Sequence, residues 1–198
     1  MCKIQKIVII GPESTGKSTL CELLAQHYRM QWCPEFAREY LVTNGKEYDF
    51  DDLLTIAKGQ LALEDEYTVL ANSQWSMVNE RIWVNPHSLI TTKHSPFLFI
   101  DTDMYVMKVW CEYVFGKCHQ FILDKIVERK YDLYLLCNTD LPWIKDDLRE
   151  YPDMGIRNEL YHIYKDLLIN QEVPWVEISG NYEDRLLLAI AAVEEYLH

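Results

Sequence analysis

The residues best suited to chemistry lie near the start of the chain, between Gly11 and Ser18. They read Gly-Pro-Glu-Ser-Thr-Gly-Lys-Ser, a complete G-x-x-x-x-G-K-[ST] motif between an apolar run and a helical pattern. In such a loop the backbone N–H groups converge on phosphate oxygens, Lys17 reaches the β- and γ-phosphates, and the Ser18 hydroxyl holds Mg²⁺. The motif therefore predicts a nucleoside triphosphate site, here termed the phosphate-binding loop, in preference to a glycine turn with a surface lysine. The residues expected to bind the nucleotide are Gly11, Glu13, Ser14, Thr15, Gly16, Lys17, Ser18 and Thr19.

Two carboxylates follow a second apolar run, at residues 97–100. Asp101 comes directly after this run and Asp103 two residues later, which is where open α/β sheets place their ligands. We expect Asp101 to bind Mg²⁺ through water, together with Ser18. We expect Asp103 to serve the metal or the substrate. The alternative is a pair of solvated loop acids.

Glu35 and Arg38 follow a possible short strand at residues 31–34. The end of that strand would open toward the same ligand crevice. There a carboxylate could take the proton of an attacking hydroxyl, and an arginine could bind an anionic or polar group of the substrate. Their spacing is equally typical of an i, i+3 ion pair on a helix surface.

A polar segment around residues 141–157 carries Arg149 and Arg157. Cations in such a segment can close over bound phosphates and neutralise the charge of a transferring phosphoryl group, so the segment is a candidate lid. On charge alone, a solvated face explains both arginines. Four aromatic residues near the expected site are candidates for stacking on a flat ring, although each also suits a structural role. They are Trp32, Tyr105, Trp110 and Trp143.

The composition excludes several classes of protein. With 31 acidic and 19 basic residues, the chain has a formal net charge of -12, and the resulting field repels nucleic acids. The longest apolar runs have about four residues, whereas a membrane span needs roughly 20. Six cysteines at irregular spacings form no C-x-x-C pair, so neither a zinc site nor a disulfide framework is expected. We expect a cytoplasmic protein that binds neither nucleic acids nor membranes.

Strands alternate with helices along the chain, and this order predicts an α/β fold in which a mostly parallel sheet lies between two helical layers. Apolar runs predict strands at residues 4–10, 31–34, 97–100, 131–137 and 175–179. Helical patterns cover residues 18–29, 35–41, 49–70, 121–129 and 156–169, and a terminal helix carries Leu186, Ile190, Val193 and Leu197 on one stripe. Residues 72–96 fit either a loop or a short extra strand. We expect one domain over residues 1–198.

Beyond the phosphate-binding loop, six further segments match a known family in order. They are residues 35–40, 57–60, 99–103, 131–136, 143–149 and 178–185. The set resembles the ribosylnicotinamide kinase domain of the bacterial bifunctional NAD-salvage protein, which has a three-layer P-loop NTPase/kinase fold. The resemblance runs nearly from end to end. It implies ATP and Mg²⁺ as cofactors, and phosphorylation of the 5′-hydroxyl of a small nucleoside, nicotinamide riboside, to give nicotinamide mononucleotide.

Each candidate residue has an expected role in this reaction. We expect Lys17 to stabilise the transferring group, Glu35 or Asp103 to orient or deprotonate the hydroxyl, and Arg149 with Arg157 to close the lid. The residues expected on the substrate side are Glu35, Arg38, Asp103, Tyr105 and Trp110. The residues expected beside the adenine are Asn181 and Tyr182.

Two features depart from the family. The chain begins almost at the phosphate-binding loop and has no His-x-Gly-His motif, so we expect a stand-alone kinase without an adenylyltransferase domain. Pro34 precedes Glu35 where some members have an aromatic residue. The alternative functions are a kinase for another nucleoside or nucleotide, and an NTP-hydrolysing regulatory module. The absence of an Asn-Lys-x-Asp guanine motif disfavours the second. The oligomeric state is left open.

Overall fold

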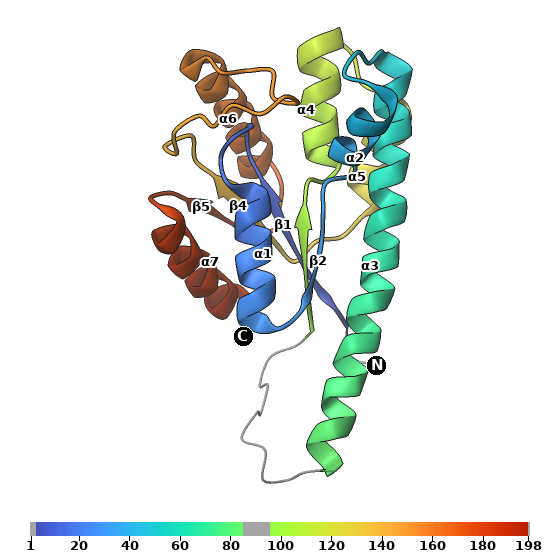
Figure 1. Cartoon of the computed structure of the whole chain (residues 1–198), viewed down its shortest axis with the longest axis vertical. Helices are drawn as coiled ribbons and strands as arrows, with labels where there is room; N and C mark the ends of the chain where they lie inside the picture. The colour runs from blue at the N-terminus through green and yellow to red at the C-terminus, as the bar shows by residue number, and fades with distance from the viewer. Residues whose placement is uncertain (1–2, 85–95, 198) are drawn as a thin grey trace.

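The computed structural model describes residues 3–84 and 96–197. Within these ranges strands and helices alternate and build an α/β fold (Figure 1). The strands are β1 (Gln5–Ile10), β2 (Gln31–Cys33), β3 (Phe97–Asp101), β4 (Leu133–Cys137) and β5 (Trp175–Ile178). The helices are α1 (Lys17–Tyr28), α2 (Phe36–Asn44), α3 (Phe50–Val84), α4 (Met104–Phe115), α5 (Gln120–Glu128), α6 (Met154–Ile169) and α7 (Tyr182–Leu197).

The strands form a parallel sheet in the order β2-β3-β1-β4-β5. The central strand β1 is a continuous apolar run from Ile7 to Ile10, and each of these residues is fully buried. Such runs are typical of parallel strands that are covered on both faces. Because all described strands point the same way, the phosphate-binding loop, Asp101 and Glu35 meet at the carboxyl edge of the sheet.

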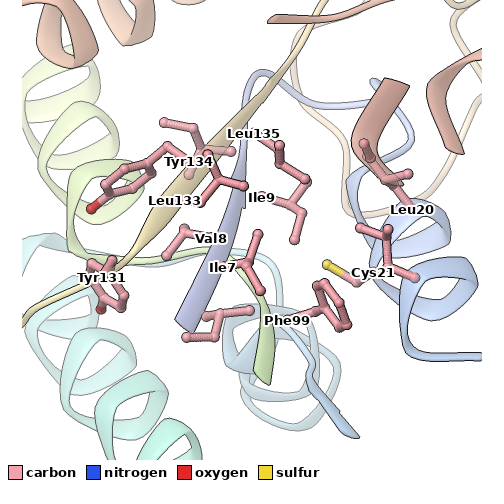
Figure 2. Close-up of a cluster of buried hydrophobic side chains, with 14 of the residues drawn as sticks. Ile7, Val8, Ile9, Leu20, Cys21, Phe99, Tyr131, Leu133, Tyr134 and Leu135 are labelled. Carbon is pink, nitrogen blue, oxygen red and sulfur yellow. The ribbon is translucent and has the colours of Figure 1, made fainter. Parts of the chain in front are cut away.

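Helices cover both faces of the sheet, which confirms the predicted three layers. Helices α1 and α7 pack together on one face, while α3, α4 and α6 lie on the other (Figure 1). Figure 2 shows the resulting alternation along β1. Ile7 and Ile9 lie on the side of Leu20 and Cys21 from α1, and Val8 lies on the opposite side.

A second apolar cluster lies beside the sheet, among α2, α3, α4 and α5. Its buried side chains include Ala37, Ile56, Met107 and Ile122, one from each helix. This packing joins α2 and α4 to the long helix α3. Helices α2 and α4 supply one wall of the site described below.

The sequence patterns do not predict α4, which lies between the two apolar clusters. Its side chains contribute to both clusters, so the helix has no continuous polar stripe to reveal its period. Helix α3 is also longer than the expected 49–70, because it continues to Val84. Residues 72–84 are therefore helical and form neither a loop nor a strand, and residues 85–95 lie outside the described residues. None of the described helices has the length and apolar character that crossing a membrane requires.

Candidate active site

The phosphate-binding loop leaves β1 and opens α1, as its sequence predicts. Gly11 and Gly16 have φ angles of 141° and 78°, which glycine adopts most readily. A Cβ atom at Gly11 would lie 2.7 Å from the carbonyl oxygen of Cys137, so β4 leaves no room for a side chain there. Lys17 Nζ donates a 3.0 Å hydrogen bond to the Pro12 carbonyl. The loop and the N-terminus of α1 thus form an anion site with a cation held across it.

Ser18 and Asp101 meet beside this loop. The Ser18 hydroxyl donates a 2.5 Å hydrogen bond to Asp101 Oδ2, and the Asp101 side chain is fully buried. Burial, together with repulsion from Glu35, raises the pKa of Asp101 to about 6, although Lys17 opposes the shift. Asp101 Oδ1 is buried without a hydrogen-bond partner among the described residues.

A hydroxyl beside an unpartnered carboxylate oxygen fits Mg²⁺, which prefers oxygen ligands. Within the described ranges no three His, Cys, Asp or Glu side chains gather in a cluster that could hold a metal. The protein would therefore supply only part of the ligand shell. That is typical of Mg²⁺ bound together with substrate phosphates.

Glu35 lies between β2 and α2, at the N-cap position of α2. Its carboxylate does not bond to the N–H groups of that helix, and Oε1 instead accepts a 3.5 Å hydrogen bond from the Thr102 hydroxyl. Thr102 has a φ angle of 81°, an uncommon conformation for a β-branched residue. The structure therefore places the expected acceptor-side carboxylate beside Asp101.

A cavity of about 390 Å³ joins the two sides of the site. This volume is within the range of small-molecule pockets. The phosphate-binding loop, Asp101, Glu35 and Arg38 line one part of it, as expected. The remaining wall is rich in aromatic side chains, which include Trp32, Trp110, Tyr113, Tyr151, Tyr164 and Tyr182.

The candidate lid lies across the phosphate-binding loop. Ser14 Oγ accepts hydrogen bonds from the Ile144 N–H, at 3.0 Å, and from Arg149 Nη1, at 3.3 Å. Glu13 Oε2 accepts from the N–H groups of residues 150 and 151, at 2.9 and 3.2 Å. Burial raises the pKa of Glu13, although these bonds oppose the shift. Two side chains of the loop thus hold the candidate lid against the loop.

The lid also contacts the acceptor side. Arg38 Nη2 forms a 2.8 Å ion pair with Asp146, and the Tyr48 hydroxyl donates a 3.0 Å hydrogen bond to Glu150. Arg38 is therefore paired with the lid and is not part of an ion pair within its own helix. The lid connects the nucleotide side of the cavity with the acceptor side.

Arg157 lies in the first turn of α6 and is fully buried. Nη2 donates to the carbonyl oxygens of Ser14 and Leu141, at 3.2 and 3.4 Å, while Nε and Nη1 have no partner among the described residues. Burial, with repulsion from Arg149, lowers the pKa of Arg157. Both guanidinium groups lie within 6 Å of the centre of the Trp143 ring. The predicted pair of cations is thus assembled beside the phosphate-binding loop.

The structure corrects the expected roles of Asp103 and Tyr105. Asp103 Oδ1 accepts hydrogen bonds from the N–H groups of Tyr105 and Val106 and so caps α4, and Oδ2 accepts from the Tyr134 hydroxyl at 2.9 Å. Burial raises the pKa of Asp103 to about 7. The Tyr105 ring packs on Tyr134, and neither Asp103 nor Tyr105 lines the cavity. Both residues make their contacts within the fold beneath the site.

Of the two residues expected beside the adenine, Tyr182 lines the cavity and Asn181 does not. Tyr182 lines the cavity next to Gly16, where a Cβ would lie 3.4 Å from the tyrosine ring. Asn181 does not line it, because its Oδ1 accepts from the N–H groups of Glu183 and Asp184 at the start of α7. Asn181 therefore acts as a helix cap.

Arg185 is a site residue that the sequence analysis does not identify. It is buried in α7 and donates to the carbonyl oxygens of Thr15, Gly180 and Asn138 at 2.8 to 3.0 Å, and it also pairs with Asp140. It thus ties the phosphate-binding loop to the end of β4. The sequence signal that could have identified Arg185 is its place among the buried positions of the amphipathic helix α7.

Comparison with known proteins finds a matching family model, similar sequences and similar solved structures. A family model described as an AAA domain matches residues 6–185. The chain is 26% identical to the trifunctional NAD biosynthesis/regulator protein NadR of Escherichia coli over 98% of its own length, and it spans 43% of that relative. A crystal structure of NadR protein in complex with NR superposes with a TM-score of 0.70 at 21% identity, over 98% of this chain and 50% of that one. Thymidylate kinase from Ehrlichia chaffeensis has the same fold, with a TM-score of 0.58, 15% identity and 96% and 97% of the two chains covered.

Proposed function

We propose that this chain, which belongs to the AAA domain family, transfers the γ-phosphoryl group of ATP to the 5′-hydroxyl of nicotinamide riboside. The observation that carries the proposal is that one continuous cavity joins a phosphate-binding loop to Glu35 and an aromatic wall. A nucleotide hydrolase needs no such acceptor side. The similarity to NadR, and to a NadR structure in complex with NR, supports the choice of acceptor.

The residues around the cavity have matching tasks. The acceptor hydroxyl oxygen bonds to the γ-phosphorus, the bond from that phosphorus to the bridging oxygen breaks, and ADP departs with the electron pair. Glu35 orients the hydroxyl and takes its proton. Lys17 and Arg149 line the cavity and stabilise the charge on the transferring group, and Arg157 supports them from the lid.

Ser18 and Asp101 are the residues that would hold Mg²⁺. When bound, the ion would neutralise phosphate charge next to Lys17. The buried Asp101 oxygen without a hydrogen-bond partner supports this assignment.

The charges of the cavity favour a cationic riboside over a nucleoside monophosphate. Nicotinamide riboside carries a positive charge on its pyridinium ring, which suits aromatic faces and the nearby carboxylate of Glu35. A monophosphate acceptor would need cations around its phosphate. Arg38, the acceptor-side arginine on the cavity wall, is already paired with Asp146.

We place the reaction in the cytoplasm. The described cysteines Cys21, Cys33, Cys111, Cys118 and Cys137 are all free thiols, four of them buried. Unpaired thiols are typical of a reducing compartment.

Initial rates test the proposed function directly. ATP and Mg²⁺ are supplied with nicotinamide riboside, with common nucleosides, and with the corresponding monophosphates. We expect the highest kcat/KM for nicotinamide riboside. A preference for any monophosphate, or hydrolysis of ATP that is as fast without an acceptor, would contradict the proposal and favour a nucleotide kinase or a regulatory NTPase.

Glu35→Gln tests the assignment of the base. It should lower phosphoryl transfer by roughly 10² to 10⁴, while the affinity for a non-hydrolysable ATP analogue stays near that of the parent. Glu39→Gln is the control, because Glu39 lies in α2, one turn after Glu35, and outside the cavity wall.

A further inference from the structure

Gln60 of α3 is a buried polar residue for which the proposed reaction has no direct use. The residue is 1% exposed, and both the oxygen and the nitrogen of its side-chain amide make contacts. Oε1 accepts a 2.7 Å hydrogen bond from the Phe36 N–H, and Nε2 donates to the Pro34 carbonyl at 3.3 Å. Nε2 also lies 3.7 Å from Cys33 Sγ. The two backbone contacts fall on the residues immediately before and after Glu35.

The Glu35 carboxylate is not engaged by the helix that it precedes. A capping side chain at the N-cap ordinarily accepts a hydrogen bond from the N–H of the second or third helical residue. Glu35 makes no such bond, and Gln60 accepts from the N–H of Phe36, the first residue of α2. The carboxylate is therefore available to the cavity that it lines.

The packing around Gln60 is tight enough to fix this arrangement. The neighbouring residue in α3 is Gly59, and a Cβ atom there would lie 2.1 Å from the ring of Phe36. Helix α3 therefore approaches the start of α2 at a distance that only glycine permits. Gln60 and Gly59 together hold the turn at Glu35 against a rigid helix.

We propose that Gln60 is a positioning residue, which holds the turn at residues 34–36 so that the Glu35 carboxylate faces the acceptor hydroxyl. The inference rests on the proposed function, because it assigns Gln60 a role through the proposed base. A displacement of about 1 Å at a reacting group can cost on the order of 100-fold in rate. The two hydrogen bonds from Gln60 to the backbone on either side of Glu35 oppose such a displacement.

A double-mutant cycle tests this dependence on Glu35. Gln60→Met keeps the length of the side chain and removes both hydrogen bonds. We expect it to lower kcat by roughly 10- to 100-fold in the parent, with the KM for ATP unchanged. In the Glu35→Gln background the same substitution should change kcat by less than about twofold, because the group it positions is already absent.

The matched control is Gln74→Met, farther along α3. Gln74 Nε2 donates a 3.0 Å hydrogen bond to the Arg29 carbonyl, away from the cavity, so kcat should not change. Circular dichroism establishes whether each variant folds. If Gln60→Met does not fold, Gln60→Asn, which keeps the amide but shortens its reach, takes its place in the cycle.

Amide hydrogen exchange gives a readout that does not depend on activity. Gln60→Met should speed exchange at the Phe36 N–H, which loses its acceptor, and Gln74→Met should not. An equal loss of kcat in both Glu35 backgrounds, or faster exchange with unchanged kcat, would overturn the role of Gln60 and leave the proposed function intact. Failure of the parent protein to phosphorylate any nucleoside would instead refute the proposed function, whatever the exchange at Phe36.

Discussion

Asp101 and Asp103 lie two residues apart after one apolar run, yet their carboxylates have different surroundings. Asp101 faces Ser18 and keeps one oxygen without a hydrogen-bond partner. Asp103 uses both oxygens, toward the first turn of α4 and toward Tyr134 of β4. The difference comes from elements that pack against the strand end from elsewhere in the chain. Sequence spacing alone could not separate the two roles.

Asp101→Asn should raise the Tm of the ligand-free protein at about pH 7.5, where the parent carboxylate is charged. The pKa of Asp101 is raised from 3.8 to about 6 in the folded state. The stability that this carboxyl contributes is therefore present at low pH and is lost as the pH rises through about 6. An uncharged amide avoids that loss. Thermal unfolding at about pH 4 and pH 7.5 should show the larger gain at the higher pH.

The same variant should lose most of the stabilisation that ATP and Mg²⁺ confer on the parent, because it lacks the carboxylate proposed to hold the ion. Asp166→Asn, on the exposed side of α6, serves as the control for both measurements. A ligand-free Tm that falls at both pH values would show that the Asp101 charge does not destabilise the fold.

Asp103→Asn should leave the Mg²⁺ dependence of the reaction unchanged, since its carboxylate caps α4 and does not line the cavity. The amide oxygen can still accept from the helix N–H groups. Asp103→Ala leaves those groups and the Tyr134 hydroxyl without an acceptor, and should cost roughly 1 to 3 kcal/mol. Chemical denaturation and a Mg²⁺ titration of activity measure the two effects. A shifted Mg²⁺ optimum in Asp103→Asn would restore this residue to the metal site.

The sequence predicts functional residues that belong to a local motif. It does not identify residues whose side chains bond to backbone groups far away in the chain. The phosphate-binding loop is one continuous motif, so Lys17 and Ser18 can be assigned from local order. Arg185 and Gln60 act by bonding to backbone groups far away in the chain. Nothing in their local sequence states which backbone they will meet.

At the scale of elements, the predicted strands are confirmed. Strands β1, β3 and β4 contain short apolar runs with clear boundaries, whereas β2 is only the three residues Gln31–Cys33. Helix α4 was not predicted, since its side chains enter both apolar clusters and its pattern lacks a polar side. The lid has no regular structure before α6, and its position depends on contacts with Glu13, Ser14 and Arg38. The sequence predicts that the arginines of such a segment are candidates for binding phosphate, but it does not predict where the segment lies in the fold.

Glu13→Ala should loosen the lid by removing the carboxylate that accepts from the N–H groups of residues 150 and 151. We expect amide exchange across residues 144–151 to become about tenfold faster in the ligand-free protein. Glu22→Ala is a matched control, because Glu22 is exposed on α1 and accepts a hydrogen bond from Gln26 in its own helix. Equal exchange in Glu13→Ala and the parent would show that the other contacts hold the lid without Glu13.

At the scale of the whole molecule, a net charge of -12 accompanies a site that we propose binds ATP, which is itself an anion. The phosphate-binding loop, Lys17 and Arg149 concentrate positive charge where the phosphates would lie. The surrounding acidic field instead attracts a cationic acceptor. Glu35 and Asp101 extend that negative potential into the cavity.

This field should make the use of nicotinamide riboside depend on salt. With ATP and Mg²⁺ saturating, kcat/KM for the riboside should fall severalfold between low ionic strength and about 0.3 M salt, because mobile ions screen its attraction to the acidic protein. The matched control is the uncharged 1,4-dihydro form of the same riboside, for which binding measured by competition should change by less than about twofold. An equal decline for both forms would mean that salt acts on the lid or on nucleotide binding, and that the negative field does not guide the acceptor to the cavity.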